Sequence, residues 1–305
     1  MELGLVLPHS GPMASPTFIR DFATVAEEHR FDGLWAVDHL VLPRRVDSPY
    51  VLGRAPVTVA DGWLADHLAP NFEMMTTLAW VAAQTSTIRL GTSVAVLPIR
   101  NPIANARQLA SLDVLSGGRL TYGVGIGWMR EEADAMGLPW HRRAARSEEH
   151  VAVLRAFWEG DEPFVEFHGE FVDFDEMDRR PQPVRRTIPI LVGGHSPAAQ
   201  RRAVRIGDGW IAAPMPPQRL VELIARLRRI ASEEGRSLEE FRIVAGAAVG
   251  DVATVTSFVQ PYREAGVDHL QLVLPDADPS ETIDLIAAIA STVRGENTTS
   301  RNTIM

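Results

Sequence analysis

The stretch from Ile88 to Trp128 most constrains what this chain can fold into. It opens with an apolar, β-branched run over Ile88–Leu97, which fits a strand covered on both faces. Asn101 and Pro102 then supply a capping side chain and a proline for the first turn of a helix, and a pair of glycines ends that helix. A second strand follows at Leu120–Ile126. This unit predicts a parallel sheet with a right-handed crossover.

The same alternation continues along the whole chain. Further strands are expected at 3–7, 33–37, 188–192, 210–213, 243–249 and 269–274, and helices at 16–30, 72–85, 147–158, 197–206, 219–234, 253–264 and 279–293. Eight strands that alternate with helices predict a (β/α)8 TIM barrel. The alternative is a doubly wound open sheet, but no GxGxxG motif follows the first strand.

We expect one domain over residues 1–294, with a flexible tail at 295–305. Two segments interrupt the alternation and are predicted as insertions, at about 41–70 and 160–187. The first is a long, proline-containing loop, and such loops in compact domains are usually functional lids or disordered. Trp63 favours a packed lid that lines a substrate pocket. The second contains the alternating segment FVEFHGEFVDF, which predicts a hairpin outside the main sheet.

Composition excludes several kinds of chemistry. The chain has no cysteine, which rules out thiolate nucleophiles, iron–sulfur clusters and disulfides. It also has no lysine, which rules out Schiff-base catalysis and a P-loop. The nine histidines form no HExxH or HxH motif, so we expect no catalytic metal. A net charge of −9 argues against nucleic acid as a partner. With no apolar stretch of membrane-spanning length and no signal-peptide pattern, we expect a cytoplasmic protein that is not membrane-bound.

In a barrel, the site lies on the loops that follow the strands. The residues expected there are Pro8, His9, Asp38, His39, Ser93 to Leu97, Ile126, Gly127, Trp128, Gly193, Gly194, His195 and Ser196. Barrel closure would bring these loops to one mouth. A histidine side chain can donate or accept a proton near neutral pH, so His39 is a candidate for proton exchange with a substrate. A strand-end histidine bonded to backbone is the alternative.

Several segments together resemble the bacterial luciferase-like superfamily of flavin and deazaflavin oxidoreductases. They are GLWAVDHL, LGTSVAVLPIRNP, QLASLDVLSGGR, GVGIGWMREE and IPILVGGHSPAA, and they span most of residues 1–215. The last third of the chain matches only in its expected strands and helices. The resemblance implies a TIM barrel and an oxidoreductase activity.

The resemblance also assigns roles to the strand-end residues. In the deazaflavin branch, an Asp-His pair at the place of Asp38 and His39 contacts the cofactor head, and the histidine assists proton transfer. Ser93 and Val94 stand where the family has a β-bulge, often with a non-proline cis peptide, that supports the ring of the cofactor. The alternative, if the resemblance is set aside, is that Ser93 and Val94 are ordinary residues of a core strand.

The glycines around Ile126 and Gly127 would let a flat ring approach the backbone, with Trp128 as a wall of the substrate pocket. The alternative is tight strand–helix packing around a core tryptophan. Some sugar-phosphate dehydrogenases of the family carry a catalytic glutamate where Trp128 stands, so their acid and substrate are not transferred to this chain. Glu131 and Glu132 follow at a helix start, where we expect a solvated face.

A phosphate group of the cofactor is expected at Gly193, Gly194, His195 and Ser196, because a glycine turn leads there into a capped helix start. A plain strand–helix turn is the alternative. The barrel rule would place phosphate after the seventh and eighth strands. Those loops carry Asp251, Asp276 and Asp278, which would repel it.

The sequence therefore predicts an enzyme that moves a hydride between coenzyme F420 and a small organic substrate. One alternative is a two-component monooxygenase that uses FMN and oxygen and depends on a separate flavin or F420 reductase system. A second is a non-catalytic flavin-binding protein, because fold does not fix function. The predicted helix at 72–85 is apolar around much of its circumference, which predicts a homodimer.

Overall fold

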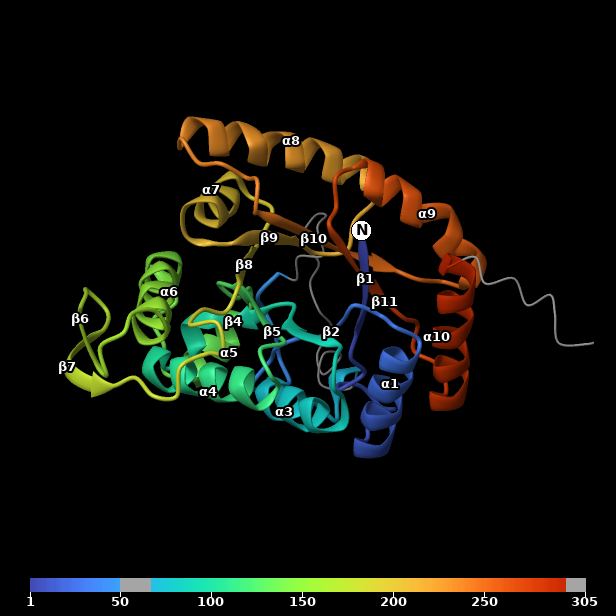
Figure 1. Cartoon of the computed structure of the whole chain (residues 1–305), viewed down its shortest axis with the longest axis horizontal. Helices are drawn as coiled ribbons and strands as arrows, with labels where there is room; N and C mark the ends of the chain where they lie inside the picture. The colour runs from blue at the N-terminus through green and yellow to red at the C-terminus, as the bar shows by residue number, and fades with distance from the viewer. Residues whose placement is uncertain (50–66, 295–305) are drawn as a thin grey trace, which may run out of the picture.

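The computed structural model describes residues 1–49 and 67–294 and contains a closed barrel of parallel strands. In space, the strands follow the order β3-β2-β1-β11-β10-β9-β8-β5, and pairing of β3 with β5 closes the ring. The helices lie around the outside of the strands (Figure 1). The predicted TIM barrel is therefore confirmed, and the doubly wound sheet is excluded.

The expected elements form close to their predicted bounds. The barrel strands are β1 (Glu2–Val6), β2 (Gly33–Ala36), β3 (Arg89–Thr92), β4 (Ala95–Val96), β5 (Leu120–Gly125), β8 (Ile190–Gly193), β9 (Gly209–Ala212), β10 (Arg242–Ala248) and β11 (His269–Val273). The larger helices are α1 (Pro16–Glu28), α3 (Met74–Gln84), α4 (Pro102–Leu115), α6 (Arg143–Trp158), α7 (Pro197–Ile206), α8 (Pro217–Glu233), α9 (Val252–Glu264) and α10 (Pro279–Arg294). A short helix, α5 (Arg130–Ala135), follows β5.

One predicted strand is divided in two. The run Ile88–Leu97 was expected to be continuous, but it forms β3 and β4 on either side of Ser93 and Val94, whose peptide bond is cis. A 3-10 helix, η1 (Leu97–Ile99), takes up the end of the run. Both β3 and β4 pair with β5, so together they fill one position of the barrel.

Helix α4 begins as its sequence predicts. The Asn101 side chain caps it by accepting hydrogen bonds from the backbone N–H groups of Ile103 and Ala104, both at 3.1 Å. Val114, which has the helical spacing of the inward residues, is instead 45% exposed. Leu112 and Asp113 in the same turn are buried instead, so the inward face of α4 ends at these two residues.

The hydrophobic residues form two layers. The larger layer lies between the strands and the helices and includes the fully buried Phe22, Leu78 and Leu154. A separate, smaller cluster comes from β2, β8, β9 and β10 and consists of Trp35, Leu191, Ile211 and Val244, with Val94 packed against it. Side chains from strands around the ring thus fill the interior, as expected for a barrel of this size.

The second predicted insertion is confirmed as a hairpin outside the barrel. Strands β6 (Phe164–His168) and β7 (Asp173–Asp178) pair antiparallel and form a sheet of their own. Trp63, most of the first insertion and the predicted tail at 295–305 lie outside the described residues. None of the helices in 1–49 and 67–294 is long and apolar enough to cross a membrane.

Candidate functional site

The predicted site residues come from neighbouring strands of the barrel. Asp38 and His39 follow β2, Ser93 follows β3, Ile126 follows β5, and the Gly193–Ser196 loop ends β8. These four strands are adjacent in the order β2-β3-β5-β8. Parallel pairing puts their carboxyl ends on the same side, so the fold brings these loops together at one mouth.

His39 is held by a buried carboxylate. Its Nδ1 lies 3.1 Å from Oε2 of Glu132 on α5, and its side chain is only 14% exposed. The Asn71 side-chain amide donates to the backbone carbonyl of His39 at 2.7 Å. The ring of Trp128 meets the imidazole edge-on, with ring centroids 5.9 Å apart. The alternative of a histidine ring bonded only to backbone does not hold.

Asp38 is buried and has different partners from His39. One of its carboxylate oxygens accepts the Val96 N–H at 2.8 Å, and the other accepts from the Arg100 guanidinium at 2.7 Å. Both side chains of this ion pair are buried. Burial lowers the pKa of Arg100, but the charge and hydrogen bond of Asp38, together with Tyr122 and Glu73, raise that pKa overall. Asp38 therefore ties the end of β2 to β4 and η1.

The Ser93–Val94 peptide follows β3 at the mouth of the barrel. The Ser93 hydroxyl is 2.7 Å from Oε1 of Gln271 on β11. The other amide atom of Gln271, Nε2, is buried and has no hydrogen-bond partner among the described residues. A buried polar atom without a partner is uncommon and calls for an explanation.

The glycines at the end of β5 make room for neighbouring side chains. A Cβ on Gly125 would lie 2.7 Å from Val94 Cγ2, and one on Gly127 would lie 2.9 Å from Val96 Cγ1. Gly127 also has a φ of +76°, which other residues rarely adopt. These two glycines therefore leave space for the side chains of Val94 and Val96. The sequence had instead suggested that they make room for a flat ring.

Apolar side chains surround Trp128. It packs with Met129, Val46, Leu42 and Leu68, which brings the ends of the first insertion against the segment after β5. Trp128 itself is partly exposed beside His39. This side of the mouth can accept an uncharged organic group more readily than a charged one.

The loop after β8 is held rigidly by its own side chains. Nε2 of His195 accepts the Ala213 N–H at 3.0 Å, and the Ser196 hydroxyl caps α7 by accepting from Ala199 N–H at 3.1 Å. Burial lowers the pKa of His195, and the positive charges of Arg219 and Arg226 lower it further. The imidazole is thus favoured in its neutral form beside a positively charged patch.

Comparison with known proteins identifies the family. A family model described as luciferase-like monooxygenase matches residues 1–251. The chain belongs to the luciferase-like family. It is therefore an enzyme of that family, as the motifs predicted.

Relatives of this luciferase-like enzyme include F420-dependent proteins. An uncharacterized protein of Mycobacterium tuberculosis is 36% identical over 225 residues, which is 74% of this chain and 75% of the relative. The F420-dependent glucose-6-phosphate dehydrogenase of Nakamurella multipartita is 34% identical over 240 residues, or 76% of this chain and 62% of the relative. An F420-dependent secondary alcohol dehydrogenase, solved with an F420-acetone adduct, has the same fold with a TM-score of 0.74 at 18% identity, covering 94% of this chain and 98% of that one.

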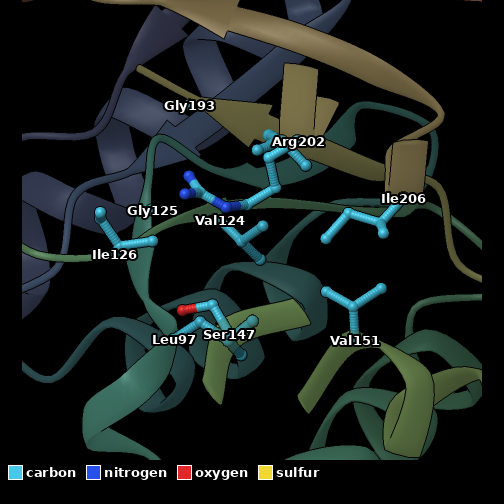
Figure 2. Close-up of a pocket in the computed structure, with 10 residues that line it drawn as sticks. Leu97, Val124, Gly125, Ile126, Ser147, Val151, Gly193, Arg202 and Ile206 are labelled. Atoms are coloured by element: carbon cyan, nitrogen blue, oxygen red, sulfur yellow. The ribbon is translucent and has the colours of Figure 1, made fainter. Parts of the chain in front are cut away.

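A pocket beside the mouth is lined by three of the predicted residues, Leu97, Ile126 and Gly193. It lies between the ends of β5 and β8 and the helices α6 and α7. Figure 2 shows the Arg202 side chain reaching into this space, with the Ser147 hydroxyl nearby. His39 does not line the pocket. The pocket therefore adjoins the mouth of the luciferase-like barrel without containing its histidine.

His9 takes no direct part in the mouth. It is fully buried, and its ring nitrogens lie 3.1 Å from the carbonyl of Leu7 and 3.0 Å from that of Val37. It joins the ends of β1 and β2.

Sequence reasoning missed three residues of the site: Glu132, Arg100 and Gln271. Glu132 was expected on a solvated face, but its side chain is 2% exposed, because the loop after β2 covers α5. One signal in the sequence could have pointed to Glu132. It lies in the first turn of a helix, four residues after the predicted pocket residue Trp128. No local pattern marked Arg100 or Gln271.

Proposed function

We propose that this protein is an F420-dependent oxidoreductase that transfers a hydride between coenzyme F420 and a small organic substrate. The observation that carries the proposal is the His39 imidazole, held by Glu132 and partly exposed beside Trp128. The F420-dependent relative that is 34% identical over three quarters of the chain supports the choice of cofactor.

The residues of the mouth fit a flat ring with polar edges. We expect Ser93, Val94, Ile126 and Gly127 to hold that ring. The unpartnered Nε2 of Gln271 lies beside Ser93, and a polar atom of a bound ring is a suitable acceptor for it. Bound F420 supplies the position that accepts or gives the hydride, while the protein orients it.

The loop from Gly193 to Ser196 fits the phosphate of the cofactor. It leads into the N-terminus of α7, where the helix dipole favours an anion. Arg219 and Arg226 add positive charge on the neighbouring α8, and their mutual repulsion contributes to the lowered pKa of Arg226 after burial. An anion would relieve that repulsion. Arginine also pairs well with the carboxylates of the acidic F420 tail.

His39 moves the proton in the proposed reaction. When an alcohol is oxidised, its carbon loses a hydride and its hydroxyl loses a proton, and the Nε2 atom of His39 takes that proton. In the reverse direction, a ketone gains the hydride and receives the proton from the imidazolium. Trp128 and its apolar neighbours keep bulk water away from this side.

The substrate of the glucose-6-phosphate dehydrogenase relative is not proposed for this chain. Trp128 stands where a catalytic glutamate is found in sugar-phosphate dehydrogenases of the family, and its surroundings are apolar. The chain also spans only 62% of that relative. We therefore propose an uncharged substrate, such as a secondary alcohol or ketone.

Parallel fluorescence titrations with F420 and FMN test the cofactor. We expect F420 to bind at least tenfold more tightly, which corresponds to about 1.4 kcal/mol. Turnover is then measured from F420 absorbance with 2-propanol, cyclohexanol, their ketones and glucose 6-phosphate. Tighter binding of FMN, with oxygen consumption in the presence of a flavin reductase, would instead favour the monooxygenase that the family description names.

A further inference from the structure

We infer that Glu132 is a positioning residue that fixes the tautomer of His39. Its carboxylate keeps the ring proton on Nδ1 and leaves the lone pair of Nε2 free to accept a proton. The catalytic part of this inference rests on the proposed function, whereas the tautomer can be measured without any cofactor.

The contacts of Glu132 connect two separate segments. Oε2 lies 3.1 Å from Nδ1 of His39, and Oε1 accepts the Leu40 N–H at 2.7 Å and the Val41 N–H at 3.4 Å. The side chain of Glu132 is only 2% exposed. One carboxylate thus holds both the imidazole and the backbone that follows it. The backbone N–H groups fix the carboxylate, and the fixed carboxylate holds the ring through Nδ1.

The chemistry of the carboxylate decides the position of the proton. An ionised carboxylate only accepts hydrogen bonds, so the nitrogen that it faces must carry a hydrogen. Neutral imidazole has one N–H, and that hydrogen is therefore on Nδ1 of His39. Nε2 has no hydrogen-bond partner among the residues that the structure describes, so its lone pair remains available to a substrate.

The same contact stabilises the charged product of proton transfer. When Nε2 of His39 takes a proton, the ring becomes an imidazolium next to the negative carboxylate of Glu132. A carboxylate behind a catalytic histidine acts in this way in hydrolases, where it orients the ring and stabilises its charge. In this barrel, Glu132 would serve a redox reaction instead.

The substitution Glu132→Gln tests the inference because it should reverse the tautomer. The glutamine oxygen can keep the short hydrogen bond to Leu40 N–H, which turns the NH2 group toward His39. That group only donates, so Nδ1 must become the acceptor and the ring proton must move to Nε2. The shape and the backbone contacts are nearly unchanged.

The readout is 15N NMR of the histidine rings in the cofactor-free protein, with the His39 signals assigned by their loss in His39→Ala. We expect protonated Nδ1 in the wild type and protonated Nε2 in Glu132→Gln. Glu131→Gln is the matched control. Its carboxylate holds the same loop through Asp47 and Ser48 N–H groups, at 2.7 and 2.9 Å, but does not contact His39. In Glu131→Gln, His39 should therefore have the same tautomer as in the wild type.

The kinetic expectation follows from the tautomer. Turnover of Glu132→Gln with the best alcohol of the panel should fall about 10³- to 10⁴-fold, by analogy with acid-to-amide changes behind catalytic histidines. The Kd for F420 should change less than twofold. Adding His39→Ala to Glu132→Gln should cause little further loss, because both changes remove one function.

An unchanged His39 tautomer in Glu132→Gln, or turnover above half that of the wild type, would overturn the inference. An equal tautomer change in Glu131→Gln would also overturn it, because the effect would then belong to the loop. Failure of the wild type to bind F420 would contradict the proposed function instead and would leave the NMR result standing.

Discussion

Trp35 Nε1 donates a hydrogen bond to His269 Nε2 at 2.9 Å, inside the barrel and across the position of Gly4. The indole can only donate, so Nε2 of His269 must be the acceptor and its proton must lie on Nδ1. That Nδ1 is 3.1 Å from a carboxylate oxygen of Glu2. Three strands are thereby joined by side chains at the end of the barrel opposite the mouth.

Gly4→Ala should destabilise the protein by about 1–3 kcal/mol, the usual cost of overpacking a core. The added Cβ would lie 2.4 Å from His269 Nε2 and 2.7 Å from Trp35 Nε1. Urea unfolding measures this cost. The Trp35→Phe substitution removes Nε1 and also the hydrogen bond that holds His269 Nε2 in place. The double variant should therefore lose less stability than the sum of the two single variants. A strictly additive result would show that the space above Gly4 is not limiting.

Acid should weaken the fold through Glu2. Burial raises the pKa of Glu2, but the hydrogen bonds from His269 and Arg89 and the charges of Arg89 and Arg242 lower it from 4.5 to about 2. Because the folded pKa is depressed, the stabilisation is complete above about pH 4.5 and is lost as the pH falls toward 2. Glu2→Gln should therefore cost about 1–3 kcal/mol at pH 6, and this difference should fade below pH 4.5. A difference independent of pH in urea titrations would contradict this account.

Asp38 and His39 are neighbours in sequence but should respond differently to substitution. Asp38→Asn removes one charge of the buried pair with Arg100, and breaking such a pair typically costs about 3–5 kcal/mol of folding stability. His39→Ala should cost less stability, because Glu132 keeps its hydrogen bonds to the Leu40 and Val41 N–H groups. Thermal denaturation of both variants compares them, and equal losses of stability would argue against separate roles.

His39→Ala should lower turnover by about 10²- to 10⁴-fold, the usual contribution of a proton-transfer group. The Kd for F420 should change less than threefold, because the ring is expected to rest on Ser93 and Val94. Steady-state kinetics and fluorescence titration measure the two quantities. Unchanged turnover would remove His39 from the mechanism.

Much of the fold could be predicted because its signals are local. Strands buried on both faces read as short apolar runs, and caps such as Asn101 mark where helices begin. The break at Ser93 was indicated only by resemblance to the family, because nothing within the run Ile88–Leu97 itself marks an interruption between Ser93 and Val94.

The polar partners of the site could not be predicted in this way. Glu132 meets His39 across 93 residues, and Gln271 meets Ser93 across 178. Such pairs depend on which loops fold over one another. Glu132 is buried because Leu40 and Val41 cover it, and no periodic pattern in the sequence records that contact.

The homodimer expected from the helix at 72–85 stays a prediction. Trp80 in α3 is 45% exposed, although the buried face of the helix is formed by other residues. We expect light scattering to show a dimer at about 10 μM protein and a monomer for Trp80→Glu. Val221→Glu, at a similarly exposed position of α8, is the control and should leave the mass unchanged. A monomeric wild type would refute the prediction.

The position of β1 between β2 and β11 has a consequence for how the chain acquires its structure. The contact between Glu2 and His269 spans 267 residues, so β1 keeps one unpaired edge until β11 is available. Contacts so distant in sequence form slowly, and open strand edges promote aggregation. The segment from β3 to β5 is a compact unit of local contacts and is the natural place for folding to begin. Pairing of β1 with β11 then removes the open edge of β1. This step requires both ends of the chain, so the barrel is complete only when the whole chain has folded.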